Sequence, residues 1–269
     1  MTNDRPRRLP RPLMHSALRW LLVSLIAAGC DWGVGPDDVV LSEPFDYQQD
    51  ATGRTRFRVV GINGDITITG VAQGDTLRAT GFRRVRNCSR SQAEQWMAQL
   101  QVQVSATADE IVVQTVQPLD TNPCTLEVEY EVTVPARLAA RAVNVNGNVT
   151  ATDMGDGASV TNVNGNVTLA GIAGSTRVRL TNGNIAADVE IAGAEAIDLL
   201  TVNGNVALAI PTTTSAMLLA TVINGTISIA NLVLMNQVST GTTLTGTLGT
   251  GEGDIALRTT NGNIAVAGT

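Results

Sequence analysis

Few residues in this chain of 269 are able to do catalytic chemistry. The only His is His15, and every one of the 18 basic residues is Arg, so Lys is absent. A Ser or Cys nucleophile would therefore lack the base that usually activates it. The common zinc ligand sets cannot be assembled either. The sequence predicts no metal site, no cofactor and no nucleophilic catalysis.

A pair of carboxylates is the remaining catalytic option, as in glycoside hydrolysis. Glu127, Glu129 and Glu131 are the candidates, and they alternate with apolar residues in LEVEYEV. Alternation places the three acids on one face of a β-strand and the apolar residues on the other. We therefore expect a solvated strand face and no catalytic residue.

The first 29 residues resemble a bacterial lipoprotein signal peptide. Five Arg precede a short apolar run, Trp20 to Ala28, which is too short to span a bilayer. Ala27-Ala28-Gly29-Cys30 resembles a lipobox, in which the cysteine is lipidated and becomes the new N-terminus. The alternative is an ordinary secretory signal, with Cys30 an incidental thiol. We expect a signal peptide over 1–29, a lipid on Cys30 that attaches the chain to a membrane, and a tether over 30–52.

With Cys30 lipidated, Cys88 and Cys124 remain and can pair in an oxidising envelope. The alternative is two buried free thiols. A basic stretch with Arg83, Arg84 and Arg86 lies just before Cys88, and the acidic stretch with the three Glu lies just after Cys124. The disulfide would therefore bring the two stretches together, and their side chains could form cross-strand ion pairs. The other interpretation is a separate basic patch that meets acidic polymers or lipid headgroups, with further members Arg54, Arg56, Arg58, Arg78 and Arg90.

The net charge of −6 argues against a nucleic-acid partner. The acids of Asp153-Met-Gly-Asp156 and Glu252-Gly-Asp254 could suggest calcium, but the G-G-x-G-x-D repeat of a calcium-bound β-roll is absent, so we expect turn residues.

The main signal is a repeated Asn-Gly dipeptide, which is typical of a sharp bend with positive φ. Its copies are Asn63-Gly64, Asn146-Gly147, Asn164-Gly165, Asn182-Gly183, Asn203-Gly204, Asn224-Gly225 and Asn261-Gly262. From 146 the gaps are 18, 18, 21, 21 and 37 residues, and the last gap divides at Thr245-Gly246, which we interpret as a degenerate copy. Such spacing predicts one coil per copy.

The residues after each turn support this interpretation. In most copies a branched apolar residue lies three positions after the turn Asn, and a second apolar residue lies five positions after it. The residue between these two is small. This alternation predicts a strand with one face in the core. An antiparallel meander of hairpins is the competing arrangement. We favour stacked coils, because the register of the repeat is constant and would place equivalent residues of successive coils next to each other.

The Asn residues of the repeats would form columns along the stack. They include Asn148, Asn166, Asn184, Asn205 and Asn263. These columns could be a structural amide ladder or a sugar-binding ladder, and we favour the first.

Three segments, VVGINGDITITG (59–70), VNVNGNVTATDMGDG (143–157) and GEGDIALRTTNGNIAV (251–266), carry a family resemblance. They resemble the putative-adhesin β-strand-repeat family of bacterial envelope proteins, which is related to the GIN-type autotransporter-adhesin-head domain. The resemblance covers about 45–269. It implies a β-solenoid and exposure in the envelope, and it brings no catalytic residue.

One stretch departs from the repeat. Ser91 and Glu94 have the spacing of a helix capping box, and Ala93, Trp96, Met97 and Leu100 form an apolar stripe. We expect a short helix over 91–100 that packs on the solenoid, with Trp96 in the core; the alternative for Trp96 is a binding aromatic.

The sequence thus predicts an all-β protein, a single-stranded β-solenoid with coils of about 16–21 residues over 53–269. Residues 53–140 carry the cysteine pair and 141–269 the regular repeats. The predicted role is a non-catalytic, adhesin-like or scaffold lipoprotein of the bacterial envelope, whose partner is an envelope glycan or a protein. The alternatives are a polysaccharide-active β-helix enzyme, for which only Arg177, Arg179 and Arg258 are available in the repeats, and an accessory component of an envelope-stress system.

Overall fold

The computed structural model describes residues 41–269. The predicted signal peptide, Cys30 and the first part of the predicted tether lie outside the described residues. Two sheets make up the described part of the chain, and one helix, α1 (Arg90–Met97), accompanies them. This helix is too short to cross a membrane, and no longer apolar helix occurs in the part that the structure describes. The predicted all-β class is confirmed.

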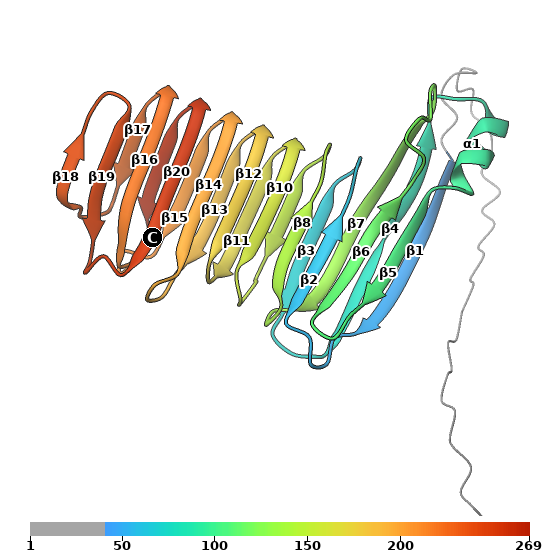
Figure 1. Ribbon diagram of the computed structural model, residues 1–269, viewed down its shortest axis with the longest axis horizontal. Helices are drawn as coiled ribbons and strands as arrows, with labels where there is room; N and C mark the ends of the chain where they lie inside the picture. Colours follow the sequence, from blue (N-terminus) through green and yellow to red (C-terminus); the bar gives the residue numbers. More distant parts are fainter. Residues whose placement is uncertain (1–40) are drawn as a thin grey trace, which may run out of the picture. The chain divides into compact units, whose positions relative to one another are not determined.

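Sheet A has ten strands (Figure 1). Their order is β1 (Leu41–Asp50), β4 (Thr76–Arg86), β7 (Thr125–Pro135), β3 (Ile66–Val71), β9 (Val149–Thr152), β11 (Val167–Ala173), β13 (Ile185–Glu190), β15 (Val206–Ile210), β21 (Ile264–Gly268) and β17 (Ile227–Ala230).

Sheet B has eleven strands. Their order is β18 (Met235–Ser239), β19 (Thr243–Leu248), β16 (Ala216–Asn224), β20 (Gly253–Asn261), β14 (Ala196–Asn203), β12 (Thr176–Asn182), β10 (Ala158–Asn164), β8 (Ala139–Val143), β2 (Arg56–Val60), β6 (Glu110–Val116) and β5 (Gln101–Ala106).

From β8 to β15 the chain alternates between the two sheets, so each coil adds one strand to sheet B and one to sheet A. The Asn-Gly bend lies between those two strands. Neighbouring coils pair in parallel, with Val167 beside Ile185 and Ile185 beside Val206. Parallel pairing rules out the antiparallel meander for these coils. The alternating apolar residues face inward and are almost fully buried.

The glycine of each bend is required by sterics. Gly165 has φ of 126°, and a Cβ on it would overlap the carbonyl oxygen of Gly147 in the adjacent coil. The bends therefore stack at a separation that only glycine permits. The seven predicted Asn-Gly glycines all have positive φ.

The order of the coils differs from their order in the sequence. The last coil, β20–β21, lies between β14–β15 and β16–β17. Consequently Val206 pairs with Ile264, and Ile227 pairs with Ile264 instead of following Val206 directly.

The prediction of a degenerate coil at Thr245-Gly246 is wrong. These residues lie inside β19, which runs antiparallel to β16, and Gly246 pairs with Leu218. A side chain at position 246 would overlap the side chain of Leu234, which packs against Gly246. Glycine is therefore needed here for packing and not for a bend.

The N-terminal part is mainly antiparallel. Residues 41–50, expected to belong to the tether, form β1, which pairs with β4, and β4 in turn pairs with β7. Cys88 and Cys124 form the predicted disulfide across the ends of β4 and β7.

Helix α1 is present but begins and ends earlier than expected. Its capping box is formed by Ser89 and Gln92 instead of Ser91 and Glu94, because Ser89 is the last residue with an extended backbone. Glu94 instead forms an ion pair with Arg90. Ala93 and Met97 are buried, and Trp96 is half-buried against the core, which agrees with its predicted packing role.

Candidate functional surface

The outward-facing positions of sheet B carry an unusual concentration of arginine. In β2, β8 and β12 the outward residues alternate with buried Val, Ala and Phe. Strand register then sets the outward residues side by side: Arg58 next to Arg141, Arg141 next to Ser159, and Ser159 next to Arg177. Asp198 of β14 follows Arg177. We call these five residues the arginine row.

Arg58 and Arg141 face each other without a neutralising acid. No carboxylate within residues 41–269 forms an ion pair with either of them. The Nε of Arg58 is also buried without a hydrogen-bond partner. Strands lie about 4.8 Å apart, and like charges directly opposite each other destabilise a sheet. This pair therefore costs stability in the unliganded protein.

Asp198 ends the row with three arginines around one carboxylate. Its oxygens lie 3.8 Å from Arg177 and 3.4 Å from Arg258, and Arg179 forms the closest pair. One negative charge against three positive charges leaves this cluster positive. Arg179 is held in place by a further bond to the backbone oxygen of Asp198.

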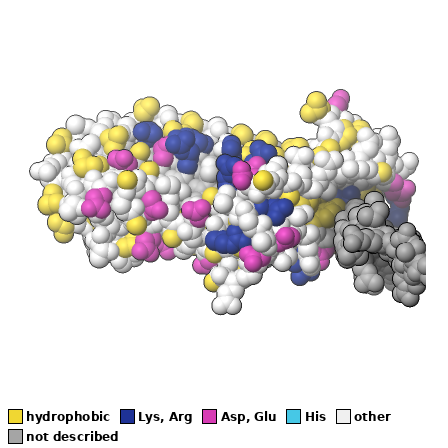
Figure 2. All heavy atoms as spheres, turned by 60° about the horizontal axis from the view of Figure 1, so that its bottom comes forward, with side chains coloured by type: hydrophobic (Ala, Val, Ile, Leu, Met, Phe, Trp, Pro, Cys, Tyr) yellow, Lys and Arg dark blue, Asp and Glu magenta, His cyan; other side chains and the backbone are white. Residues whose placement is uncertain are grey.

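A shallow hollow borders the row between β8 and β14. Its volume is about 380 Å³, and Ser159, Arg177 and Asp198 contribute to its lining. The space-filling view shows arginine side chains gathered over the middle of the molecule, with acidic side chains on either side (Figure 2). The surface is therefore a positive region on a protein whose net charge is negative.

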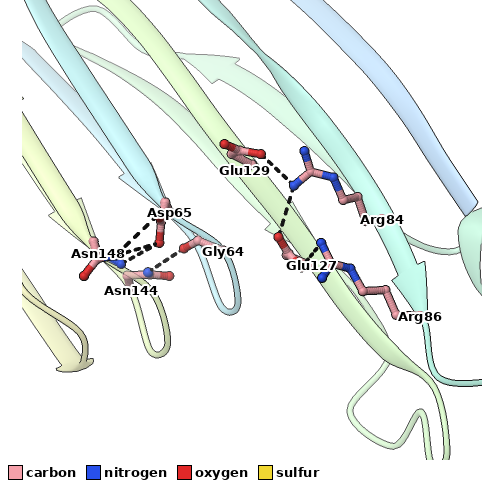
Figure 3. Close-up of polar contacts among 8 residues, drawn as sticks. All are labelled: Gly64, Asp65, Arg84, Arg86, Glu127, Glu129, Asn144 and Asn148. Atoms are coloured by element: carbon pink, nitrogen blue, oxygen red, sulfur yellow. Dashed lines mark hydrogen bonds and ion pairs between the residues drawn. The ribbon is translucent and has the colours of Figure 1, made fainter. Parts of the chain in front are cut away.

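The predicted carboxylate candidates lie in β7 of the other sheet, where Glu127 and Glu129 form ion pairs and Glu131 is exposed. Arg84 lies 3.1 Å from Glu127 and 2.6 Å from Glu129, and Arg86 lies 3.1 Å from Glu127 (Figure 3). Of the two open interpretations for Arg84 and Arg86, the cross-strand pairing is the one observed. These exposed or half-exposed pairs contribute little individually, so their main effect is to fix the β4–β7 register.

The edge strand β1 is attached in the same way. Arg83 pairs with Glu43 and Arg78 with Asp46, each at 2.6 Å. The hydrogen bond from Arg78 lowers the pKa of Asp46 below its ordinary value.

Tyr130 of β7 is buried, and its hydroxyl group forms a hydrogen bond with that of Thr115. Burial raises the pKa of Tyr130 above its ordinary value. Tyr130 is therefore neutral and structural.

The Asn-Gly bends form two hydrogen-bonded ladders. In the first, each turn Asn donates from Nδ2 to the Oδ1 of the Asn in the preceding coil, in the order Asn224, Asn261, Asn203, Asn182, Asn164, Asn146 and Asn63. In the second, the residues two positions later accept a backbone N–H through Oδ1, beginning with Asp65 and Asn148 (Figure 3). The amide oxygens serve the fold, as the structural interpretation predicts.

Of the acids considered for calcium, Asp153 and Asp156 lie in a turn and Glu252 precedes β20, but Asp254 lies inside β20 and was wrongly expected in a turn. Asp153 has a positive φ of 57°, and Asp156 follows in the same turn. Over residues 41–269 no group of three or more His, Cys, Asp or Glu is placed to hold a metal ion.

Sequence reasoning missed the arginine row although a signal for it exists. Arg58, Arg141, Ser159, Arg177 and Asp198 each stand five residues before a turn Asn. The predicted basic patch includes Arg54, Arg56, Arg58, Arg78 and Arg90, and of these only Arg58 belongs to the row. Arg78 and Arg90 are instead bound in ion pairs away from the row. Extending the register to residues before the bend would have identified the row.

Comparisons with known proteins bear on the fold. The family model described as Toastrack DUF4097 matches residues 62–267. No curated protein matches the chain. Among solved structures, a putative cell adhesion protein from Clostridium sporogenes ATCC 15579 is similar over 84% of this chain and 100% of that chain, with 12% identity and a TM-score of 0.46. A putative adhesin from Bacteroides fragilis NCTC 9343 covers 88% and 100%, with 11% identity and a TM-score of 0.29.

Proposed function

The chain belongs to the Toastrack DUF4097 family, and we propose that it is a non-catalytic, adhesin-like binding protein of the bacterial cell envelope. A lipid on Cys30 attaches it to the membrane. Its binding surface is the arginine row, and its ligand is an envelope glycan that carries carboxylate or phosphate groups.

The observation that carries this proposal is the unneutralised Arg58–Arg141 pair. Two like charges in register on adjacent strands are unfavourable unless an anion lies between them. The orphaned Nε of Arg58 offers a donor in the same place. A bound carboxylate or phosphate would accept bonds from both guanidinium groups and relieve their repulsion.

The shape of the surface favours a polymer. The row crosses five parallel strands, with Arg58 and Arg141 about one strand spacing apart and Arg177 two strands beyond Arg141. The outward neighbours are small, such as Ala139, Ser159 and Thr161. No aromatic residue of the kind that anchors a protein partner occurs in β2, β8, β10, β12 or β14 except the buried Phe57. Arginine forks and hydroxyls match an acidic sugar chain better.

The Cys30 anchor is supported by the sequence features around it. Five Arg, a short apolar run and Ala-Ala-Gly-Cys precede a segment that leads into β1 at Leu41. Replacing Cys30 by Ala is expected to leave the chain uncleaved or soluble. Partitioning between detergent and aqueous phases measures this, and an unchanged distribution would contradict the anchor.

Binding to polygalacturonate and to inorganic polyphosphate tests the surface. The double variant Arg58→Gln/Arg141→Gln removes two charge-assisted hydrogen-bonding groups, each worth roughly 1.5–3 kcal/mol, so the Kd is expected to rise at least tenfold. Added salt should weaken wild-type binding to both polymers. Comparison of the Kd for polygalacturonate with the Kd for polyphosphate shows whether the surface prefers carboxylate or phosphate groups.

Arg90→Gln is the matched control, because Arg90 is exposed, belongs to α1 and pairs only with Glu94. It removes one positive charge, against two in the double variant, without touching the row. If the double variant and this control bind both polymers as the wild type does, the arginine row is not the binding surface. Unfolding midpoints of the variants show whether both remain folded; the double variant is expected to be at least as stable as the wild type.

A further inference from the structure

The end of the solenoid formed by β16–β19 lacks charge altogether. Residues 199–251 contain no Asp, Glu or Arg, although Asp198 and Glu252 stand immediately on either side. This segment includes β15 to β19. We call the surface formed by β17, β18 and the intervening loop 231–234 the neutral end.

Both sheets terminate there in strands with an unpaired edge. β17 pairs only with β21, and β18 pairs only with β19. Edge strands are usually protected by charges or Pro. Neither β17 nor β18 has one, although β18 contains a bulge between Met235 and Val238.

The opposite end of sheet A is protected in the usual way. Its edge strand β1 carries Glu43, Pro44 and Asp46, and α1 packs against β1 and β4. At that end the edge strand of sheet B, β5, has no charge or Pro either, so the neutral end is the one where both edge strands lack them.

Apolar side chains are exposed on the neutral end. Val233 is 83% exposed, Ile223 at its border 64% and Val238 62%. Ile227 and Ile229 are only partly buried, whereas Ile264 at the equivalent position of the adjacent coil is fully buried. Hydrophobic side chains are visible at the left tip of the space-filling view (Figure 2). Leu232 and Leu234 pack against the core here, but they cover the last coil less completely than a neighbouring coil covers each inner one.

The first Asn ladder is also open at this end. Asn63 closes the opposite end by donating to the backbone oxygen of Leu126. Asn224 donates to Asn261, and no donor within residues 41–269 reaches its own Oδ1. The ladder and sheet A thus end at the β16–β17 coil, and sheet B continues beyond it through β19 and β18.

We propose that the neutral end docks onto the neutral end of a second copy of this chain, with the unpaired strands and exposed apolar residues of both copies in contact. A two-fold axis brings the same surface of each copy together, so any charge on it would face itself. A surface free of charge avoids that repulsion in a protein with net charge −6. The exposed apolar residues of both copies are buried together.

A membrane surface fits this end less well. Residues 199–251 contain no Arg, Trp or Tyr, and these are the residues that bind interfaces and anionic lipids. A charged protein partner would find no complementary group. The arginine row lies on other coils and stays accessible in the dimer, so the two proposals stand or fall separately.

Sedimentation equilibrium of the full wild-type chain in density-matched detergent tests the proposal. The protein mass is expected to approach twice that of one chain as the concentration rises. Ser228→Lys places a charge at the centre of β17, and the mass is expected to return to that of one chain. Thr168→Lys is the matched control, because Thr168 occupies the same position of the inner strand β11, and it should leave the dimer intact.

Cross-linking provides a readout that tolerates altered stability. With a short bis-maleimide, Ser228→Cys is expected to give a covalent dimer, whereas Thr168→Cys should remain a single chain. A wild-type chain that sediments as one chain at every concentration overturns the proposal. So does equal cross-linking of the two cysteine variants, or cross-linking of Ser228→Cys in cells to a different protein only.

Discussion

Asn162 is a buried polar residue that fixes the position of one coil on the next. Its side chain is 2% exposed. Its Nδ2 donates to the backbone oxygen of Gly147 in the neighbouring coil, and its Oδ1 accepts from the backbone of Val163. Because a buried polar group without a partner is costly, these bonds select one register of the two coils.

Replacement of Asn162 by Ala is expected to lower the free energy of unfolding by about 1–3 kcal/mol, because the oxygen of Gly147 loses its donor in a buried site. Asn162→Thr should recover part of the loss. Thr201 and Thr259 occupy the same position of other coils and donate from Oγ1 to Gly183 and Gly204. Denaturant unfolding measures both variants. Equal stability of the wild type and the Ala variant would show that the bond does not contribute.

At the level of single residues, the sequence predicted the positions whose role is local. Asn-Gly bends and the outward face of Glu127 can be inferred from neighbours in the chain, and the Cys88–Cys124 pair follows from the number of cysteines. The Arg58–Arg141 contact could not be read in this way, because 83 residues separate its members and only the strand register joins them. The helix cap was misplaced by two residues because Ser89 and Ser91 are both good caps, and the backbone conformation decided between them.

At the level of elements, the inward columns are the main source of cohesion. Val167, Ile185, Val206 and Ile264 stand in register on successive strands of sheet A, and each is buried. Alternation of apolar and small residues predicted which face of each strand is inward. It could not predict which coils are neighbours, because every copy of the repeat has the same pattern.

Truncation of Ile185 to Ala is expected to cost about 2–4 kcal/mol, since it leaves a cavity between two coils. Ala186→Ser, on the exposed face of the same strand, should change stability by less than about 0.5 kcal/mol. Ile227→Ala should cost less than Ile185→Ala, because Ile227 is only partly buried in the last coil. Denaturation midpoints give the order of the three. Similar losses at 185 and 186 would mean that the alternation does not define the core.

At the level of the whole molecule, the chain order departs from a simple winding at both ends of the repeat array. β2–β3 lies between β6–β7 and β8–β9, and β20–β21 lies between β14–β15 and β16–β17. Strands that are far apart in sequence, such as β14 and β20, are therefore direct neighbours. The 37-residue gap before Asn261 marks this departure in the sequence, but an extra degenerate coil explained the gap equally well until the pairing was known.

Deletion of residues 252–269 tests this order. In a simply wound solenoid the deletion would remove the last coil and leave the others paired, since each coil is stabilised mainly by its neighbours. Here it removes β20 and β21 from inside both sheets, so β16 and β17 lose the strands that join them to β14 and β15. Residues 216–250 are therefore expected to lose their protection from proteolysis and hydrogen exchange, while β8 to β13 keep theirs. Full protection of 216–250 would show that β16–β17 can close directly onto β14–β15, and that the inserted coil is not needed to hold the end of the molecule.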